Sequence, residues 1–507
     1  MADSDRVGFH FEASELTDES LHVVGVEGRE AISRLYRFSI ELVSDNHAVD
    51  LETLLQSPAR LTLDQGGAIF RSIDGVLSHV EQLDSHTDFA RYRVELVPRL
   101  WWLTLTTQNQ IYQDKSVEDV VADELLGAGL ARSDFEFVLN ESAVRSGTAG
   151  PKEYRVQFRE SNLHFVDRLL EHEGFYYFFR EEDDDSGRSF EKIRFCDSAD
   201  DTLPIGDGLS LPYRPTISQG LHDEANAMLS WRYRVKQVPE KVRLREYNYR
   251  IPKVMLDCEA RVPDGDRGQV RVFGDHFANQ EAGRFLARVR AEQVRASRQV
   301  FEGESSSPHL RAGHRFSLDE HPHHAFCQTY LVTSVEHRVT LPNPLHAHGQ
   351  AFGDDEDAAS QRPYRARVTA IPVSVPYRPP QVTEKPRVRG VMSAWVESES
   401  GSPYAEIDDE GRYRVRLTWD VGDAAEGRAS RFLRMAQPYV GESEGTHFPL
   451  RAGTEVLWAC VDGDPDRPVI LGAVPNPDNP SQVTAGNRSQ SVIRTASGVL
   501  IQFNDVL

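Results

Sequence analysis

Three aspartates lie at alternate positions in a stretch rich in glycine and proline: Asp462, Asp464 and Asp466. This spacing is that of the first ligands of an EF-hand calcium loop, which also needs a glycine at its sixth position and a glutamate at its twelfth. Arg467 and Ala473 occupy those two positions here. The loop lacks both the turn residue and the bidentate ligand, so we predict that it binds no calcium.

The residues on either side of this acidic loop predict two strands. Residues 454–461 are rich in β-branched and aromatic side chains, and residues 468–472 form a short apolar run. Two such runs joined by a tight loop with Asp-Gly and Asp-Pro are typical of a β-hairpin. The aspartates are then solvated turn residues.

Histidines offer a second candidate for a metal site. They gather in the string HPHHAF (321–326), and more occur nearby in the sequence: His309, His314, His337, His346 and His348. No carboxylate or cysteine falls at a standard zinc or iron spacing with them. We interpret this group as satisfied or exposed histidines, and we predict no metal-binding residue.

Other pairs of titratable residues give no catalytic site. His172-Glu173 begins like the zinc motif H-E-x-x-H, but Tyr176 stands where the second histidine is needed. The acidic pairs have the composition of solvated loops; they are Asp183 to Asp185, Asp354 with Asp355, and Asp408 with Asp409. The chain contains no nucleophile elbow and no phosphate-binding or dinucleotide fingerprint. We therefore predict that the protein is not an enzyme and has no catalytic residue, no cofactor-binding residue and no cofactor.

The bulk composition limits the classes of partner. A length of 507 residues suggests about three domains. A formal net charge of -22 disfavours nucleic acid and anionic membrane surfaces as partners, because both would repel the chain. No apolar stretch is long enough to span a membrane, and the first residues do not have the order of a secretory signal. These features predict synthesis in the cytoplasm, which leaves export by a signal-independent route open.

The elements that would position these residues are mostly strands. Short alternating runs between Phe9 and Leu100 predict strands of a barrel or sandwich; four of them are residues 35–44, 59–64, 70–80 and 92–98. Apolar residues at helical spacing predict helices at residues 116–129, 160–174 and 279–297. Ser116 suits the start of the first of these helices, and Gly174 suits the end of the second.

A proline-rich spacer separates this region from a small β domain. In the spacer, an acidic patch leads into the string VPYRPPQVTEKPRV, which is typical of a stiff, extended linker. After it, the string YRVRLTW (413–419) alternates Tyr413, Val415, Leu417 and Trp419 with Arg414 and Arg416. This alternation predicts a strand with one buried face, and about 85 residues of short strands suit a five-stranded OB barrel.

The order of these pieces resembles the VgrG family, the spike proteins of type VI secretion systems. The resemblance covers nearly the whole chain, and in chain order its strings include RFSIELVS, IYQDKSVEDVV, YRVQFRESNLHFVDRLLEHEGFYYFF, LRAGHRFSLDEHP, DDEGRYRVRLTWD and GTEVLWACVDGDPDRPVILGAVPNP. It implies a mainly β fold with a few helices, in which hub-like β-barrels precede an OB-fold domain and a short stub of a trimeric β-helix needle. The expected parts are a phage hub-like region (1–365), a proline-rich linker (366–388), an OB-fold domain (389–475) and a neck with the start of the needle (476–507).

The same resemblance implies a structural role in assembly. A spike of this family is expected to be a homotrimer at the tip of the Hcp tube that contacts baseplate proteins and delivers effectors into target cells. A PAAR tip protein and effectors would bind to it if a needle is present; only about 28 residues follow Asn479, and they hold no β-helix repeat. The expected location is the bacterial cytoplasm before firing, followed by secretion or injection without a signal peptide.

Two other functions stay open at this point. A fused hub-spike protein of an extracellular contractile injection particle has the same layout. A protein of another class, an OB-type module that binds nucleic acid or glycan, would use the face that carries Arg414, Arg416 and aromatic residues. The negative net charge of the chain counts against nucleic acid.

The last residues of the chain predict a contact between copies. The run TASGVLIQFNDVL is strand-like, with Val499, Ile501 and Phe503 on one side and little charge. Left unpaired, such a strand would be an exposed and aggregation-prone edge. We therefore predict that three copies converge here and that Val499, Ile501 and Phe503 form a trimer contact.

Overall fold

We describe the protein from a computed structural model, which covers residues 7–16, 20–140, 150–183, 189–215, 226–345, 364–422 and 424–505. The chain divides into two compact units. The amino-terminal unit contains residues 1–106, 116–150 and 162–383, and the carboxy-terminal unit contains residues 107–115, 151–161 and 384–507. The domain limits expected from the sequence stay predictions.

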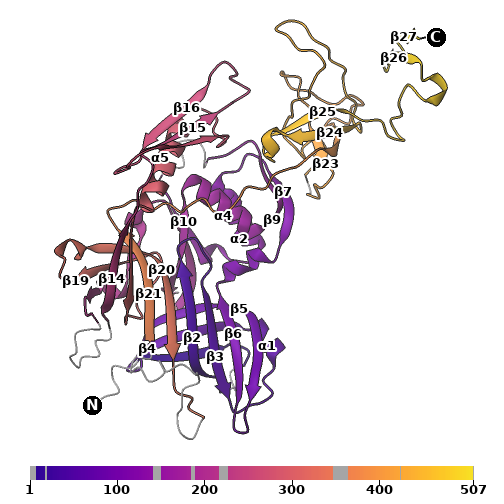
Figure 1. The fold of residues 1–507 in the computed structure, drawn as a ribbon. Helices are drawn as coiled ribbons and strands as arrows, with labels where there is room; N and C mark the ends of the chain where they lie inside the picture. Colours follow the sequence, from indigo (N-terminus) through magenta and orange to yellow (C-terminus); the bar gives the residue numbers. More distant parts are fainter. Residues whose placement is uncertain are drawn as a thin grey trace. The chain divides into compact units, whose positions relative to one another are not determined.

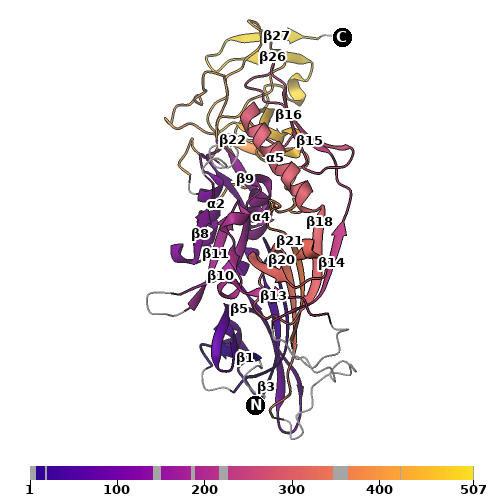
Figure 2. The ribbon, with the colours of Figure 1, turned by 90° about the vertical axis from the view of Figure 1, so that its left-hand side faces the viewer.

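The fold is mainly β with a few helices, as predicted. Most of the amino-terminal unit is built on one curled, 13-stranded sheet (Figures 1 and 2). Its neighbouring strands are, in order, β1 (Val7–Ala13), β4 (Pro58–Gln65), β5 (Ala68–Ser85), β6 (Ala90–Val97), β3 (Arg37–Ser44), β2 (His22–Ala31), β20 (Thr329–Thr340), β21 (Tyr364–Pro372), β18 (Gln299–Ser305) and β14 (Met228–Val235). The remaining strands are β19 (His314–Asp319), which pairs with β20, and β12 (Leu203–Pro204) and β13 (Ser210–Pro212), which both pair with β19.

The alternation of side chains along these strands produces the core of the sheet. In β3, Phe38, Ile40 and Leu42 are buried, whereas Arg37 is exposed and Glu41 is half-buried. Period-two alternation of this kind places every second side chain on the core face. The four strands predicted in this region are confirmed as β3, β4, β5 and β6.

The three predicted helices are confirmed as α2 (Val117–Gly127), α4 (Asn162–Glu173) and α5 (Gln280–Ala296). Ser116 caps α2 in a capping box with Asp119, and Gly174 follows α4 with a φ of 77°. The short helix α1 (Leu51–Gln56) was not predicted from the sequence. Within the described residues, no helix combines the length and the apolar character that a membrane crossing requires.

Two smaller sheets and several short turns complete this unit. One sheet has the order β10 (Tyr176–Asp183), β11 (Ser189–Cys196) and β8 (Phe135–Val138), and the other has the order β16 (Leu256–Arg261), β15 (Lys241–Glu246) and β17 (Gln269–Phe273). Helix α5 packs against β15 and β16. Short 3-10 helices are η1 (Arg99–Thr104), η2 (Arg132–Asp134), η3 (Ala199–Asp201), η4 (Gly206–Gly208) and η5 (His324–Phe326).

The carboxy-terminal unit contains a small antiparallel sheet that isolated bridges extend. Its strands are β23 (Val415–Leu417), β22 (Met392–Val396), β24 (Glu455–Cys460) and β25 (Pro468–Ala473), in that order. Next to β23, Tyr413 and Leu433 exchange backbone hydrogen bonds of 3.0 and 2.7 Å. Two residues later, Met435 bridges to Ile470 of β25. The segment around Leu433 therefore connects the two outer strands, as the fifth strand of an OB barrel does.

Two early segments of the chain share the core of this unit. Strands β7 (Thr107–Tyr112) and β9 (Arg155–Ser161) pair with each other. Tyr154, Val156 and Phe158 are buried in one cluster with Trp458, which is 1% exposed, and with the predicted inward residues of β23. Two further elements of the unit are the hairpin of β26 (Gln490–Arg494) and β27 (Leu500–Asn504) and the turn η8 (Ala485–Asn487).

We expect Trp458→Ala to lower the unfolding free energy of the carboxy-terminal unit by about 3–5 kcal/mol, because it leaves a large cavity in this core. Trp395→Ala is the matched control, since Trp395 on the adjacent strand β22 is 44% exposed, and it should cost well under half as much. Denaturant unfolding measures both changes. Equal losses of stability in the two variants would contradict the packing described here.

Candidate functional site

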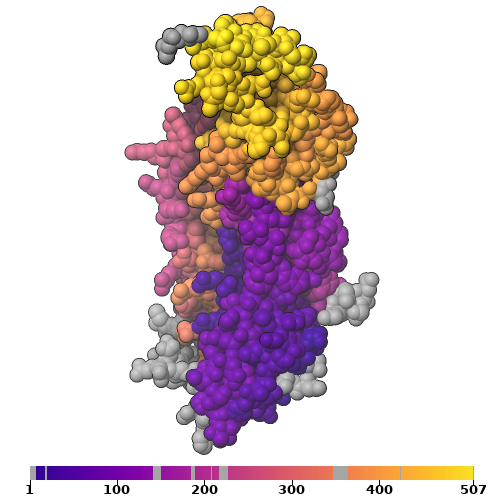
Figure 3. Space-filling model, turned by 90° about the vertical axis from the view of Figure 1, so that its right-hand side faces the viewer, coloured from indigo at the N-terminus to yellow at the C-terminus, as the bar shows by residue number. Residues whose placement is uncertain are grey.

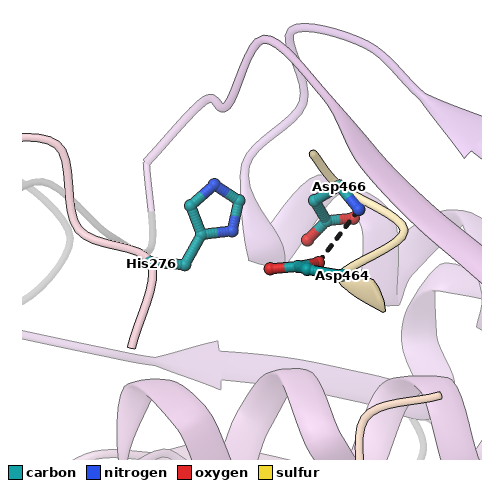
Figure 4. Close-up of side chains that lie close together, drawn as sticks. All are labelled: His276, Asp464 and Asp466. Carbon is teal, nitrogen blue, oxygen red and sulfur yellow. Dashed lines mark hydrogen bonds between the residues drawn. The ribbon is translucent and has the colours of Figure 1, made fainter. Parts of the chain in front are cut away.

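The acidic loop joins two strands of the carboxy-terminal unit, as the sequence predicts. Strands β24 and β25 are antiparallel, and the loop between them begins with the turn η7 (Val461–Gly463). Asp462 and Gly463 both have positive φ, 55° and 68°. Further on, the N–H of Asp466 donates to the carboxylate of Asp464 at 3.0 Å (Figure 4). These are the properties of a tight turn with an Asx side chain that bonds its own backbone.

The expectation that the loop aspartates are solvated is wrong for Asp466, which is 7% exposed. The carboxylates of this loop have partners within the same unit. Lys385 Nζ lies 2.5 Å from Asp464 Oδ1 and 2.6 Å from Asp466 Oδ2. The other oxygen of the Asp466 carboxylate accepts the backbone N–H of Val156 at 2.7 Å. Asp462 pairs with Arg387 at 2.8 Å. The Asp466 carboxylate therefore connects the hairpin to β9 and to the segment that enters the unit at residue 384.

The two arginines of the candidate nucleic-acid face are engaged in ion pairs. Arg414 Nη1 contacts Glu399 at 2.9 Å and also donates to the carbonyl of Gly427. Arg416 Nε donates to Glu397 Oε1 at 2.5 Å. Guanidinium groups already bonded to carboxylates are poor anchors for phosphate, so this arrangement gives no support to the OB-type binding module.

The histidines of the string HPHHAF pack against aromatic rings. The N–H of His323 donates to His321 Nδ1 at 3.0 Å, and the ring of His323 stacks on Phe326 with centroids 4.5 Å apart. Within the described residues, the three histidines of this string belong to no group of three ligand atoms close enough to share a metal ion. Their contacts are those of a surface aromatic cluster.

The other histidines singled out in the sequence have structural contacts. His337 Nε2 lies 2.9 Å from Glu30 Oε1, and Arg71 forms an ion pair with the same carboxylate. Burial by itself would raise the pKa of Glu30, but Arg71 and His337 hold it well below its usual range. Burial lowers the pKa of His314 to about 3, so its ring is neutral. His309 packs on Phe70, with ring centroids 4.4 Å apart.

His172 and Glu173 form part of a buried ion-pair network. His172 Nδ1 lies 2.9 Å from Glu173 Oε1, and His172 Nε2 lies 3.4 Å from Asp275, which also pairs with Arg290. Burial would lower the pKa of His172, but the two carboxylates raise it above its usual value. Both nitrogens of this ring face protein acceptors, so the pair has a structural explanation that needs no metal.

Of the acidic pairs, Asp408 and Asp409 lie in a loop, whereas Asp183 belongs to a strand and not to the loop that the sequence predicts. Asp408 accepts from Arg412 at 2.7 Å, and Asp409 is exposed. Asp183 is the last residue of β10. Some singled-out residues lie outside the described part of the chain: Asp184, Asp185, His346, His348, Asp354 and Asp355.

The carboxy-terminal residues form the hairpin of β26 and β27, whose side chains are largely exposed. Ile501 is 50% exposed and Phe503 is 64% exposed. In the register of the hairpin, Ile493 lies opposite Ile501, which places it on the same face, and it is 43% exposed. Val499 lies in the turn, where its N–H donates to Thr495 Oγ1. The hairpin is part of the yellow surface in Figure 3.

Sequence reasoning missed Ile493 and the pairing of the last strand with β26. The signal was present in the string QSVIR, which has two adjacent β-branched residues, Val492 and Ile493, shortly before the turn residues of TASG. Pairing with β26 leaves β27 one open edge, and the apolar face of Ile493, Ile501 and Phe503 stays exposed.

Comparison with known proteins identifies the family. Residues 29–343 match the family model of the phage tail baseplate hub (GPD), and residues 404–474 match that of the type VI secretion system/phage-baseplate injector OB domain. The chain is 31% identical over 486 residues to the type VI secretion system spike protein VgrG4b of Pseudomonas aeruginosa, with 94% of this chain and 57% of that protein covered. The chain belongs to the VgrG family. A second VgrG relative, VgrG1c of the same organism, is 30% identical and has 65% of its length covered, so the chain spans less than two thirds of either relative.

Two solved structures have the same fold as this chain. The E. coli c3393 protein, described as a component of the type VI secretion system that is similar in structure to the T4 bacteriophage tail proteins gp27 and gp5, superposes with a TM-score of 0.63 at 26% identity. That alignment covers 92% of this chain and 100% of the other. A chain of a Francisella PdpA–VgrG complex gives a TM-score of 0.56 at 9% identity over 98% of this chain and 83% of the other, which shows the fold alone. The hub and OB architecture expected of a VgrG protein is thus confirmed.

We expect Asp466→Ala to destabilise the carboxy-terminal unit by about 2–3 kcal/mol, because the N–H of Val156 and the ammonium of Lys385 lose an acceptor. Asp462→Ala is the control, since Asp462 and Arg387 are both more than half exposed and such a pair contributes less than about 1 kcal/mol. Urea unfolding followed by tryptophan fluorescence measures both. An equal effect of the two changes would show that Asp466 does not hold the hairpin to β9.

Calcium should not bind tightly to the acidic loop, because the ion would have to displace Lys385 from Asp464 and Asp466, and the loop supplies no bidentate glutamate. Isothermal titration calorimetry should detect no stoichiometric calcium uptake with a Kd below about 10 µM, the range of sensor EF-hands. Tight uptake by the chain that disappears in Asp464→Asn would prove this expectation wrong.

Proposed function

We propose that this chain is a structural spike protein of a type VI secretion system, which forms a homotrimer at the tip of the Hcp tube and delivers effectors into target cells. The observation that carries the proposal is the exposed apolar face of the tail hairpin on a chain with the VgrG hub and OB architecture. The proposed partners are a second and a third copy, the Hcp ring and baseplate proteins, with a PAAR protein and effectors wherever a needle follows.

The tail hairpin supports the trimer on physical grounds. A two-stranded hairpin is at best marginally stable by itself in water. Ile493, Ile501 and Phe503 lie together on one face, and contact between copies would remove that face from water. Threefold closure also satisfies the open edges of the hairpins, because each strand edge can then pair with the next copy around the axis. Val499, Ile501 and Phe503 are the proposed trimer contact, to which Ile493 is added.

A structural role also accounts for the titratable residues. The carboxylates and histidines singled out as catalytic candidates bond to lysine, arginine, backbone amides and aromatic rings, as described above. We therefore propose that the chain itself is not an enzyme, and that the bacterial cytoplasm is its location before secretion or injection. The relatives named above are type VI spike proteins, which favours that system over an extracellular injection particle.

We expect light scattering on the purified chain to give about three times the chain mass of 57.2 kDa. Ile501→Glu should raise the dissociation concentration of the trimer at least about tenfold, because three buried carboxylates would repel one another. Gln502→Glu adds the same charge on the opposite face of β27 and should leave the trimer intact.

A stable monomer of the unchanged chain at micromolar concentration would contradict the trimer. If Ile501→Glu and Gln502→Glu weaken the trimer equally, the apolar face of the hairpin is not the contact. Circular dichroism of both variants controls for unfolding of the hub sheet.

A further inference from the structure

Strand β17 forms the edge of a small sheet in the amino-terminal unit. The strand order is β16, β15, β17, and the parallel partner of β17 is β15 (Figure 1 shows β15 and β16 beside α5). The N–H of Gly274 donates to the carbonyl of Arg245 at 3.1 Å. Because backbone groups alternate in direction along a strand, the N–H and C=O groups of Gln269, Arg271 and Phe273 point away from β15. Within the described residues, these groups have no hydrogen-bond partner.

Two of the three charged pairs between β15 and β16 combine opposite signs, and the third sets Lys241 opposite Arg261. Asp257 of β16 lies opposite Arg245 of β15, and Glu259 lies opposite Arg243. The guanidinium group of Arg243 also donates two hydrogen bonds of 2.7 Å to the Asp257 carboxylate. On the other side of β15, the register sets Arg271 opposite Arg243. Arg271 is exposed and has no ion pair within the described residues.

Like charges opposite each other in a sheet are unfavourable, and opposite charges are favourable. The Asp257 carboxylate of β16 forms its hydrogen bonds with Arg243, so Arg271 has only a longer-range attraction to that carboxylate and its charge is offset only in part. A carboxylate on a further strand next to β17 would offset it.

Apolar side chains are also exposed along β17 and at one of its ends. Phe273 is 64% exposed and Val272 is 37% exposed. Helix α5 packs on β15 and β16, which leaves the side chains of β17 less covered. The loop between β15 and β16, at the same end of the sheet as Phe273, exposes Tyr247 and Met255. Proteins usually protect an edge of this kind, so an exposed apolar edge is typical of an interaction site.

We propose that the open edge of β17 binds an extended acidic strand of a separate partner protein, which joins this sheet as a fourth strand. The partner strand would alternate acidic and apolar side chains: the acidic ones lie on the face of Arg271, and the apolar ones lie beside Val270 and Val272 on the other face. A second copy of the chain fits poorly, because antiparallel pairing of two β17 strands centred on Arg271 would bring two Arg271 side chains together. The proposal does not depend on the trimer.

The test uses the full chain and synthetic peptides of about nine residues that alternate glutamate and valine, a length that covers a typical strand. Fluorescence anisotropy should show that this peptide binds, and that a peptide in which lysine replaces glutamate binds at least about fivefold more weakly. Arg271→Glu should weaken binding of the glutamate peptide by a similar factor and improve binding of the lysine peptide. Arg261→Glu is the matched control: it makes the same charge change at the far edge, on β16, and should alter neither affinity more than about twofold.

Peptides with N-methylated amides test whether the contact is strand pairing. In the register that the charges impose, only one alternate set of peptide N–H groups points toward β17. Methylation of that set should abolish binding, and methylation of the other set should not.

Three results would overturn the proposal. The glutamate and lysine peptides could bind equally, which would mean that Arg271 does not select an acidic strand, or could fail to bind at millimolar concentration, which would mean that Arg271 only protects the edge from pairing. Both methylated peptides could retain binding, so that the contact is not a strand. Self-association of the chain could compete with the peptide and be lost in Arg271→Glu, in which case a second copy is the occupant.

Discussion

The edges of its sheets impose the main constraint on this protein, because every edge strand presents N–H and C=O groups that need partners. In the large sheet of the amino-terminal unit, ten strands follow one another along one path, so few of them lie at an edge with unpaired N–H and C=O groups. The sheet of the OB domain is nearly closed, because the short segment at Leu433 and Met435 bridges its two outer strands. Strand β17 and the tail hairpin have edges to which no other described strand pairs, and these are the two places where partners are proposed.

Asp466 shows how a local turn becomes part of a larger arrangement. Its carboxylate belongs to a hairpin loop, but it accepts from Val156, which is distant in sequence, and from Lys385. A buried carboxylate needs such donors to compensate for the water it has lost. Protein contacts therefore explain the spacing of aspartates that resembles a metal site. Asp466 binds protein donors, and Asp462 and Asp464 shape the turn and pair with neighbouring cations.

Local patterns were enough to predict the elements with a clear periodicity but not their long-range partners. The alternation in residues 37–44 and the capping of Ser116 act between near neighbours, so the strand and the helix could be read from the sequence. Helix α1 has only six residues and little periodicity, which explains why it was missed. The grouping of Tyr154, Val156 and Phe158 with Trp458 depends on packing across some 300 residues, for which a single sequence holds no periodic signal. The same holds for Ile493, whose place beside Ile501 depends on the hairpin register.

The discontinuous make-up of the carboxy-terminal unit affects how the protein can be synthesised. Strands β7 and β9 leave the ribosome early, yet the rest of the core they share begins only at residue 384. During translation Val156 and Phe158 must stay exposed, or be held by a chaperone, until Trp458 and its strand have been made. A pause in translation between these segments would lengthen the period in which the nascent chain can aggregate, whereas the hub sheet can begin to form as its own strands emerge.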